Sequence, residues 1–369
     1  MEAAVPDRRT MLSGMAAIVA TSLPALSQSS ALRFDRVMSG LDEPWGLAFL
    51  PDGGFLVTER EGRLTAARGG SATRLGGLPD VEADGQGGLL DVMVPRDFGR
   101  SREVFLSYAV RQGRGAGTAL AVGRWDAGTD RLADLRVLFQ SAPGFRGGRH
   151  FGSRIVEAPD GRLFLTIGDR GADMSAQDLS NHNGTVVRIN RDGSVPGDNP
   201  FVNTPGARPE IWSYGHRNPQ GATLDQEGTL WISEHGARGG DEINRIRPGA
   251  NYGWPVISYG RHYSGRRIGE GTAKPGMEQP EFYWDPSIAP SGMIIHSGRL
   301  FPDWRGQIFV GSLNSDHIAR VGGAPLRELE RMATPETARV RDIREAPDGS
   351  VWFLSVRNGA IYRIAPAAA

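Results

Sequence analysis

The segment from Tyr214 to Trp254 holds the residue types best suited to chemistry in this chain. It reads YGHRNPQGATLDQEGTLWISEHGARGGDEINRIRPGANYGW. Arg217, Asn218 and Gln220 lie together beside a proline, and a Gly-rich acidic loop, EHGARGGDEIN, follows one short strand pattern. Guanidinium and amide groups bind anionic organic ligands, and an oxygen-rich, sharply turning loop suits a hard cation such as calcium. The segment is therefore the first candidate for a ligand site, although these polar groups could instead tie a turn together.

His150, in the segment GGRHFGS, is a candidate general base. An imidazole can take up a proton near neutral pH, and this one lies just before an apolar strand pattern that starts at Gly152. A lone loop histidine is more often a hydrogen-bonded surface residue, so the residue type alone leaves both roles open. No HExxH or other paired zinc spacing occurs among the remaining histidines, which are His182, His216, His235, His262, His296 and His317.

Arg339 and Arg341 alternate across Val340, so both side chains point the same way on a strand. On a solvated face such a pair is unremarkable. On a shared axis it would form a fork for carboxylates.

Glu242 and the carbonyls of the Gly-rich loop could bind calcium. The pair Asp241-Glu242 lacks the spacing of an EF-hand, and an acidic pair that caps a turn is the commoner arrangement. The chain also lacks a G-x-S-x-G elbow, a P-loop and a Rossmann fingerprint, so hydride chemistry would need some other cofactor.

One pattern recurs six times and predicts the elements that position these residues. A Gly-started apolar strand, a Pro-Asp-Gly-type turn and a second apolar strand form each copy, which is typical of a β-hairpin. A hairpin cannot bury both faces alone, so neighbouring copies must stack, and a spacing of roughly forty to seventy residues fits four-stranded blades. The copies start at Gly46, Gly88, Gly152, Gly221, Gly292 and Arg341.

These repeats predict an all-β fold, a six-bladed β-propeller of four-stranded antiparallel blades over residues 31–366. The alternative, a pair of open β-sheets forming a sandwich, would not explain the repetition. Loops from all blades converge on a propeller axis, so residues far apart in the sequence can meet there.

The bulk composition excludes several function classes. The 369 residues include 42 Lys plus Arg and 42 Asp plus Glu, and this balance predicts no nucleic-acid or anionic-membrane partner. Cysteine is absent, which excludes disulfides, thiolate metal sites and a catalytic thiol. Any metal must be held by oxygen or imidazole.

Residues 1–28 are predicted to be an export signal. Arg8 and Arg9 precede an apolar run that is too short and too rich in Ala and Ser for a stable membrane span. The arginine pair favours the twin-arginine route to the periplasm, with cleavage near Ser27 or Gln28. The alternative is an uncleaved N-terminal anchor.

Eight ordered motifs resemble the soluble pyrroloquinoline-quinone (PQQ) dependent sugar dehydrogenases, the glucose/sorbosone dehydrogenase family, and match best its periplasmic aldose sugar dehydrogenase branch. The resemblance runs from about Gly40 to Pro366. It implies a six-bladed propeller that uses PQQ and calcium to oxidise aldose sugars to lactones, with the natural electron acceptor left open. The motifs are EPWGLAFLPDG, GQGGLLDV, GRHFGSR, WSYGHRNPQG, SEHGARGGDEIN, NYGWP, APSGM and VRDIREAPDG.

The resemblance implies a role for each polar candidate. His150 would take the proton of the sugar's anomeric hydroxyl, while hydride passes from the anomeric carbon to the quinone carbonyl carbon. Arg217 would lie against the quinone oxygen and stabilise its developing charge. The cofactor itself would be held by Asn218 and Gln220, and its carboxylates by Arg339 and Arg341.

The resemblance also implies two calcium sites. The carbonyls of Gly236 and Ala237 would bind the calcium that also coordinates PQQ. A second, structural calcium would use the Glu242 side chain and the Tyr252 carbonyl.

Gln86 falls where the family contacts the sugar, and Trp284 is expected at the sugar entrance. Two positions depart from the family pattern. Arg149 replaces an acidic residue of the glucose-oxidising branch. Asn314 stands where relatives carry a lysine that contacts the cofactor, a loss on the order of 1.5–3 kcal/mol if one charged hydrogen bond is missing.

Two alternatives stay open on the same fold. A calcium-dependent lactonase would want several Asn, Asp and Glu side chains on the axis, where this sequence offers arginines. A non-catalytic binding propeller is the other, and Asn314 is the feature that favours it.

Overall fold

A computed structural model describes residue 1, residues 32–126 and residues 128–367. Apart from residue 1, the predicted export signal over residues 1–28 lies outside these residues. Within the described part, no helix has the length and apolar character needed to cross a membrane.

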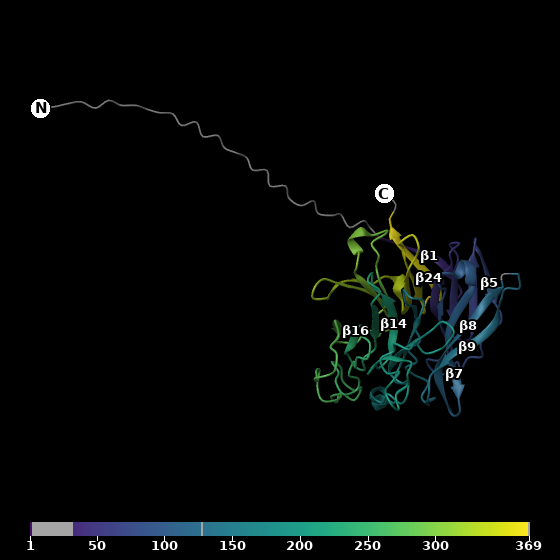
Figure 1. Cartoon of the computed structure of the whole chain (residues 1–369). Helices are drawn as coiled ribbons and strands as arrows, with labels where there is room; N and C mark the ends of the chain where they lie inside the picture. The colour runs from purple at the N-terminus through teal and green to yellow at the C-terminus, as the bar shows by residue number, and fades with distance from the viewer. Residues whose placement is uncertain (2–31, 127, 368–369) are drawn as a thin grey trace.

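The described residues form six antiparallel sheets of four strands, arranged as the blades of a ring (Figure 1). Blade 1 contains β2 (Pro44–Phe49), β3 (Phe55–Glu59), β4 (Arg63–Arg68) and β5 (Ser71–Leu75). Blade 2 contains β6 (Leu89–Met93), β7 (Glu103–Gln112), β8 (Gly115–Asp126) and β9 (Arg131–Gln140). Blade 3 contains β10 (Ile155–Glu157), β11 (Leu163–Ile167), β12 (Thr185–Ile189) and β13 (Ile211–Tyr214).

Blade 4 contains β14 (Pro219–Leu224), β15 (Leu230–Glu234), β16 (Asp241–Arg245) and β17 (Phe282–Trp284). Blade 5 contains β18 (Pro290–Ile295), β19 (Ile308–Ser312), β20 (Ile318–Gly322) and β21 (Arg327–Met332). Blade 6 contains β22 (Val340–Glu345), β23 (Val351–Ser355), β24 (Ala360–Pro366) and β1 (Leu32–Ser39). The helical turns are α1 (Phe98–Ser101), η1 (Asp173–Gln177), η2 (Pro302–Trp304) and η3 (Pro335–Thr337). The predicted all-β, six-bladed propeller is confirmed.

The innermost strand of each blade lies at the start of a predicted repeat. The six strands β2, β6, β10, β14, β18 and β22 contact their counterparts in both neighbouring blades, and the contact of β2 with β22 completes the ring. The Pro-Asp-Gly turns form as expected. In blade 1, for example, the Asp52 carboxylate accepts a hydrogen bond from the Gly54 N–H at 3.1 Å, and Gly53 takes a φ of 85° that disfavours other residues.

The hydrophobic core is divided into layers between adjacent blades. Leu56 and Leu64 of blade 1 pack with Leu89 and Leu106 of blade 2, and all four are completely buried. The alternating apolar residues of each strand supply one side chain to each neighbouring layer. This packing fixes the inner strands around a common axis.

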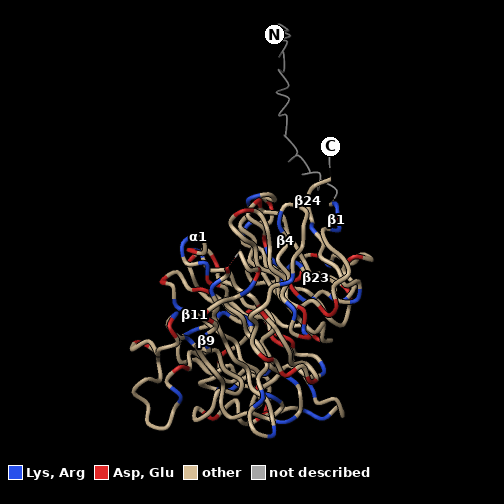
Figure 2. The backbone as a smooth tube through the Cα atoms, turned by 90° about the vertical axis from the view of Figure 1, so that its right-hand side faces the viewer, with Lys and Arg blue, Asp and Glu red and all other residues tan. Residues whose placement is uncertain are grey.

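Blade 6 is built from both ends of the chain. Its strand order is β1-β24-β23-β22, and β1 pairs antiparallel with β24 from Leu32↔Pro366 to Ser39↔Ala360. Figures 1 and 2 show the two strands side by side at the end of the molecule where the chain terminates. The repeat pattern did not predict this pairing.

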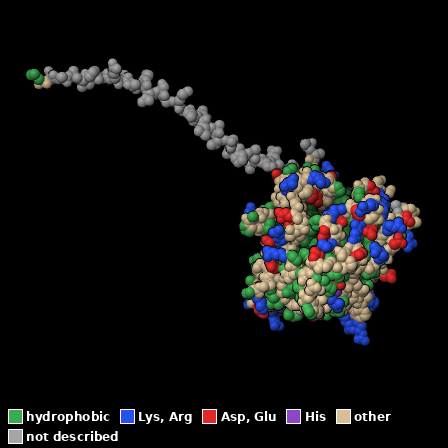
Figure 3. All heavy atoms as spheres, viewed as in Figure 1, with side chains coloured by type: hydrophobic (Ala, Val, Ile, Leu, Met, Phe, Trp, Pro, Cys, Tyr) green, Lys and Arg blue, Asp and Glu red, His purple; other side chains and the backbone are tan. Residues whose placement is uncertain are grey.

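Charges of both signs are mixed over the surface. Figure 3 shows Lys and Arg interspersed with Asp and Glu on the face in view, without a region of one sign. This distribution agrees with the equal numbers of basic and acidic residues.

Candidate active site

A cavity of about 630 Å³ lies on the propeller axis. All six blades contribute to its wall, since it is lined on or next to the inner strands by Trp45, Leu90, Phe151, Gln220, Ala289 and Arg341. Seven of the residues predicted from the sequence line it together: Gln86, Asn218, Gln220, Gly236, Ala237, Arg339 and Arg341. The remaining predicted residues, His150, Arg217, Glu242, Tyr252 and Trp284, lie outside this lining.

His150 is held beside the cavity by two hydrogen bonds. Its backbone N–H donates to the Gln86 Oε1 at 2.7 Å, and its imidazole Nδ1 lies 2.6 Å from the Asp169 Oδ1. Asp169 is completely buried, and it also accepts the Trp254 Nε1–H at 2.7 Å. His150 has a φ of 57°, a sparsely populated conformation for a non-glycine residue that occurs often at functional sites.

The electrostatic surroundings keep His150 neutral and Asp169 charged. Burial lowers the pKa of His150, the Asp169 hydrogen bond raises it in part, and the Arg217 charge lowers it further. Burial raises the pKa of Asp169, but the hydrogen bond with His150, the hydrogen bond from the Gly171 N–H and the charge of Arg217 bring it below its ordinary value. A carboxylate next to Nδ1 favours the tautomer with the proton on that nitrogen, so Nε2 is left as the acceptor. This is the arrangement of an oriented general base.

Arg339 and Arg341 form no ion pair with any described residue. The Arg341 Nη1 donates to the Gln220 Oε1 at 2.7 Å, and the Arg339 Nη1 donates to the Leu313 carbonyl at 2.9 Å. Burial, followed by the nearby charges of Arg339 and Arg154, lowers the pKa of Arg341 to about 9. The axis therefore presents uncompensated positive charge to the cavity, which suits an anionic ligand.

Asn218 and Gln220 join blades 3 and 4 at the cavity wall. The Gln220 Nε2 donates to the Asn218 Oδ1 at 3.2 Å and to the Gly152 carbonyl at 3.3 Å. Both side chains are at least nine-tenths buried. Their amide groups are thus fixed in place.

Arg217 points to the Gly-rich loop of blade 4. Its Nη1 donates to the Gly236 carbonyl and, at 3.4 Å, to the His235 carbonyl. Its guanidinium carbon lies 5.2 Å from the centre of the Trp254 ring. The Arg217 Nε is buried without a hydrogen-bond partner among the described residues, so the guanidinium keeps a free N–H.

The Gly-rich loop gathers backbone oxygens around Gly236. A Cβ on Gly236 would lie 2.2 Å from the Gly239 oxygen and 2.4 Å from the Gly240 oxygen, so only glycine fits there. The Gly236 N–H donates to the Asp241 Oδ1 at 2.8 Å, which fixes the turn. Ala237 and Gly236 line the cavity at this point. Carbonyl oxygens are ligands that calcium prefers, and the Gly236 oxygen accepts a hydrogen bond from the Arg217 guanidinium in this structure.

Glu242 and Tyr252 line a second, much smaller cavity of about 10 Å³, together with Glu234. This volume holds about one water-sized atom. Burial, followed by the neighbouring charge of Glu234, raises the pKa of Glu242 to about 8. The Asn244 Nδ2 donates to both carboxylates at 3.0 Å, and its Oδ1 has no partner among the described residues.

These carboxylates do not form a larger acidic cluster. No group of three or more His, Cys, Asp or Glu side chains that could hold a metal occurs in the described part of the chain. A cation in the small cavity would therefore be bound by two carboxylates together with amide or main-chain oxygens.

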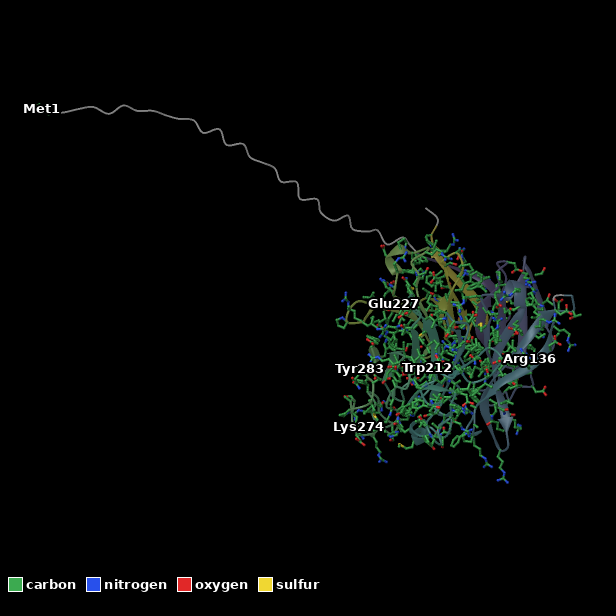
Figure 4. All side chains as sticks on the ribbon, viewed as in Figure 1. Met1, Arg136, Trp212, Glu227, Lys274 and Tyr283 are labelled. Atoms are coloured by element: carbon green, nitrogen blue, oxygen red, sulfur yellow. The ribbon has the colours of Figure 1, made fainter. Side chains whose placement is uncertain are left out.

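Trp284 does not lie at the sugar entrance, where the family resemblance led us to expect it. It lies on β17, the outermost strand of blade 4, where it is 4% exposed and donates its Nε1–H to the Glu328 Oε2 at 2.8 Å. Figure 4 shows its neighbour Tyr283 at the edge of the molecule. A side chain packed in this outer layer cannot reach the axis, so the expectation of a sugar contact at Trp284 is not retained.

Three residues that the sequence did not single out belong to the site. Asp169 orients His150, Trp45 lines the cavity, and Tyr263 lines it with 75% of its surface exposed. Asp169 lies in the segment IGDRG directly after β11, and Trp45 lies in the motif EPWG. Asn314 lines the same cavity, as expected for the position of the missing lysine.

Comparison with known proteins identifies the family. The profile described as Glucose / Sorbosone dehydrogenase matches residues 41–363. The chain belongs to this family. It is 42% identical over 362 residues to an aldose sugar dehydrogenase of Escherichia coli strain K12. The aligned region covers 93% of this chain and 97% of that protein.

Solved structures of relatives share the fold. The apo-form of the soluble aldose sugar dehydrogenase from Escherichia coli has a TM-score of 0.88 at 40% identity, covering 91% of this chain and 100% of that chain. The PQQ-bound form of an aldose sugar dehydrogenase from Streptomyces coelicolor has a TM-score of 0.75 at 26% identity. The match covers 91% of this chain and 98% of that chain. The predicted family and the predicted class, an oxidoreductase of the sugar dehydrogenase type, are confirmed.

Proposed function

We propose that the protein oxidises aldose sugars to lactones with PQQ and calcium, and that His150 is its general base. The observation that carries this proposal is the meeting, on one axis, of an oriented histidine and two arginines without carboxylate partners. His150 and Asp169 supply the proton acceptor, and Arg339 and Arg341 supply the positive charge.

The cavity residues fit a flat, anionic quinone. PQQ carries carboxylates, and the uncompensated Arg341 and Arg339 are suitable partners for them. Trp45 offers an aromatic face on the same wall, and Asn218 and Gln220 offer fixed amides. A relative in this family has been solved with PQQ bound, which supports the same ligand here.

The Gly-rich loop and the small cavity fit the two expected calcium ions. The first would be held by the carbonyls of Gly236 and Ala237 at the cavity wall. The second would be held by the Glu242 carboxylate and the Tyr252 carbonyl, in the atom-sized space beside Glu234. A divalent cation there would remove the repulsion between the two carboxylates.

Bound PQQ would supply the hydride acceptor, polarised by calcium as a Lewis acid. The chain supplies the proton chemistry. The His150 Nε2 takes the proton of the anomeric hydroxyl, and the two electrons of the anomeric C–H bond leave the sugar as hydride, so that a lactone remains. Asp169 keeps the proton on Nδ1 and stabilises the imidazolium that forms. Gln86 lines the cavity, and its Oε1 accepts the backbone N–H of His150. It can therefore position the sugar against the base.

We further propose periplasmic localisation by the twin-arginine route, based on Arg8, Arg9 and the apolar run of residues 1–28. The electron acceptor is unidentified. A lactonase is less well supported, because the axial charges of this cavity are mainly those of arginines.

Titration of the apo protein with PQQ in the presence of calcium, followed by absorption spectroscopy, tests the proposal. We expect a saturable PQQ spectrum that changes to the reduced form when an aldose is added, and reduction of an artificial dye. Failure to bind PQQ, or binding without oxidation of any sugar in a broad panel, would contradict it. Lactone hydrolysis without PQQ would favour the lactonase instead.

A further inference from the structure

Arg154 is buried below the cavity at the point where the blades meet. It is only 1% exposed and is among the largest fully buried side chains. It directly precedes β10 of blade 3, and its guanidinium contacts residues of four other blades. Such a complete burial of arginine requires compensating partners.

Two of its hydrogen bonds reach the backbone of cavity residues. The Nε donates to the Gln220 carbonyl of blade 4 at 2.7 Å, and the Nη2 donates to the Arg341 carbonyl of blade 6 at 3.1 Å. The guanidinium carbon also lies 4.2 Å from the centre of the Trp45 ring of blade 1. Gln220, Arg341 and Trp45 all line the cavity.

The remaining contacts neutralise the charge. The Arg154 Nη1 lies 3.1 Å from the Asp91 Oδ1 of blade 2 and 3.1 Å from the Asp342 Oδ1 of blade 6. Arg344 contacts the same two carboxylates, at 2.8 Å and 3.0 Å, but makes no hydrogen bond to a cavity carbonyl. The chain thus holds two arginines with the same acidic partners and different relations to the cavity.

We propose that Arg154 is a positioning residue, which sets the separation of Gln220 and Arg341 across the axis for binding of the anionic quinone. This inference rests on the proposed function. The planar guanidinium presents its N–H groups in fixed directions, so it can bond one carbonyl of blade 4 and one of blade 6 at once. Above it, the Arg341 Nη1 bonds the Gln220 Oε1, so a shift of either strand moves both cofactor contacts.

A lysine at this position would keep the charge near the carboxylates but lose the fixed geometry, because an ammonium is a point charge on a flexible stem. The matched control is the same substitution at Arg344. Arg154→Lys and Arg344→Lys disturb the same aspartates, but only the first removes hydrogen bonds to the cavity backbone.

The test is a titration of both full-length variants and the unchanged protein with PQQ and calcium, followed by absorption, with melting temperatures measured on the same samples. We expect both variants to have a lower melting temperature than the unchanged protein. The dissociation constant for PQQ should rise about tenfold or more in Arg154→Lys and stay within about twofold in Arg344→Lys, as loss of charged hydrogen bonds predicts for the first only. The KM for the sugar should change little in either.

Equal PQQ affinity of Arg154→Lys and the unchanged protein would overturn the inference, as would an equal loss in both variants. If the single variants do not fold, the charge-balanced pairs Arg154→Met with Asp91→Asn and Arg344→Met with Asp91→Asn give the same comparison. Absence of PQQ binding by the unchanged protein would instead overturn the proposed function.

Discussion

Two arginines on strand β22, Arg341 and Arg344, show how differently this propeller treats positive charge. Burial lowers the pKa of Arg344, but the carboxylates of Asp342 and Asp91 raise it above its ordinary value. Arg341 lies three residues earlier. Among the described side chains its guanidinium donates a hydrogen bond to the Gln220 amide oxygen and forms no ion pair, and its pKa falls to about 9. Positive charge is thus balanced by aspartates around Arg344 and Arg154 and uncompensated at the cavity wall around Arg341.

The same contrast holds within the pair of His150 and Asp169. The Nδ1 side of the imidazole is paired with a buried carboxylate, whereas Nε2 has no hydrogen bond to any described residue. The Nδ1 side of the imidazole is thus satisfied inside the protein, whereas Nε2 is left free to accept a proton. The following predictions test this division, from the largest expected effect to the smallest.

Replacing His150 by Ala should lower turnover by about 10²- to 10⁴-fold, because the general base is lost. Binding of PQQ should be largely unchanged, since the polar groups proposed to hold the cofactor lie on blades 4 and 6. Steady-state dye reduction and a PQQ titration measure the two effects. Near-normal turnover in this variant would show that another group accepts the proton.

Replacing Asp91 by Asn should destabilise the protein by about 3–5 kcal/mol, because Arg154 and Arg344 both lose a buried partner. Denaturant unfolding without ligand measures the change. Asp285→Asn is the matched control, because Asp285 lines the cavity and forms no ion pair with a described residue. A similar loss of stability in both variants would show that the ion pairs of Asp91 do not account for the effect.

Replacing Arg341 by Gln should weaken PQQ binding by about 1.5–3 kcal/mol, the contribution of a charged hydrogen bond. The free energy of unfolding without ligand should not decrease, since an uncompensated cation is removed from the cavity wall. Titration calorimetry and denaturant unfolding provide the two numbers. A marked loss of stability with unchanged affinity would assign Arg341 to the structural group.

Replacing Asp169 by Asn should move the acidic limb of the kcat/KM profile to lower pH. Activity requires neutral His150, and Asp169 raises the pKa of that imidazole, so its loss allows neutral imidazole to persist at lower pH. The rate at the plateau should also fall, because Nδ1 loses its orienting carboxylate. A limb that moves to higher pH, or does not move, would show that another group controls it.

The structural elements that depend on neighbouring residues could be predicted from the sequence. The Asp-Gly turns are made by neighbouring residues, so the six hairpins and their inner strands could be located, and Gln220 and Arg341 were found because they occupy the starts of those strands. The family resemblance added their roles. It could not settle the position of Trp284, because a residue on an outer strand can be adjacent in sequence to a loop that reaches the axis.

Pairings between blades were not predictable from one sequence. Arg154, next to blade 3, bonds carbonyls of blades 4 and 6 that are 66 and 187 residues away along the chain. No periodicity records such contacts, because they arise only when the ring brings the blades together. The pairing of β1 with β24 is of the same kind.

That pairing also affects the order of events during biosynthesis. Among the described strands β24 is synthesised last and its partner β1 first, so β1 stays unpaired until the other five blades have been synthesised. The axial cavity needs residues from blades 1 to 6, so a nascent chain cannot bind its ligand early. Ligand captured by the finished ring then stabilises the closed form over any opened one by mass action. Ligand binding would thus act as a late check that β1 and β24 have paired.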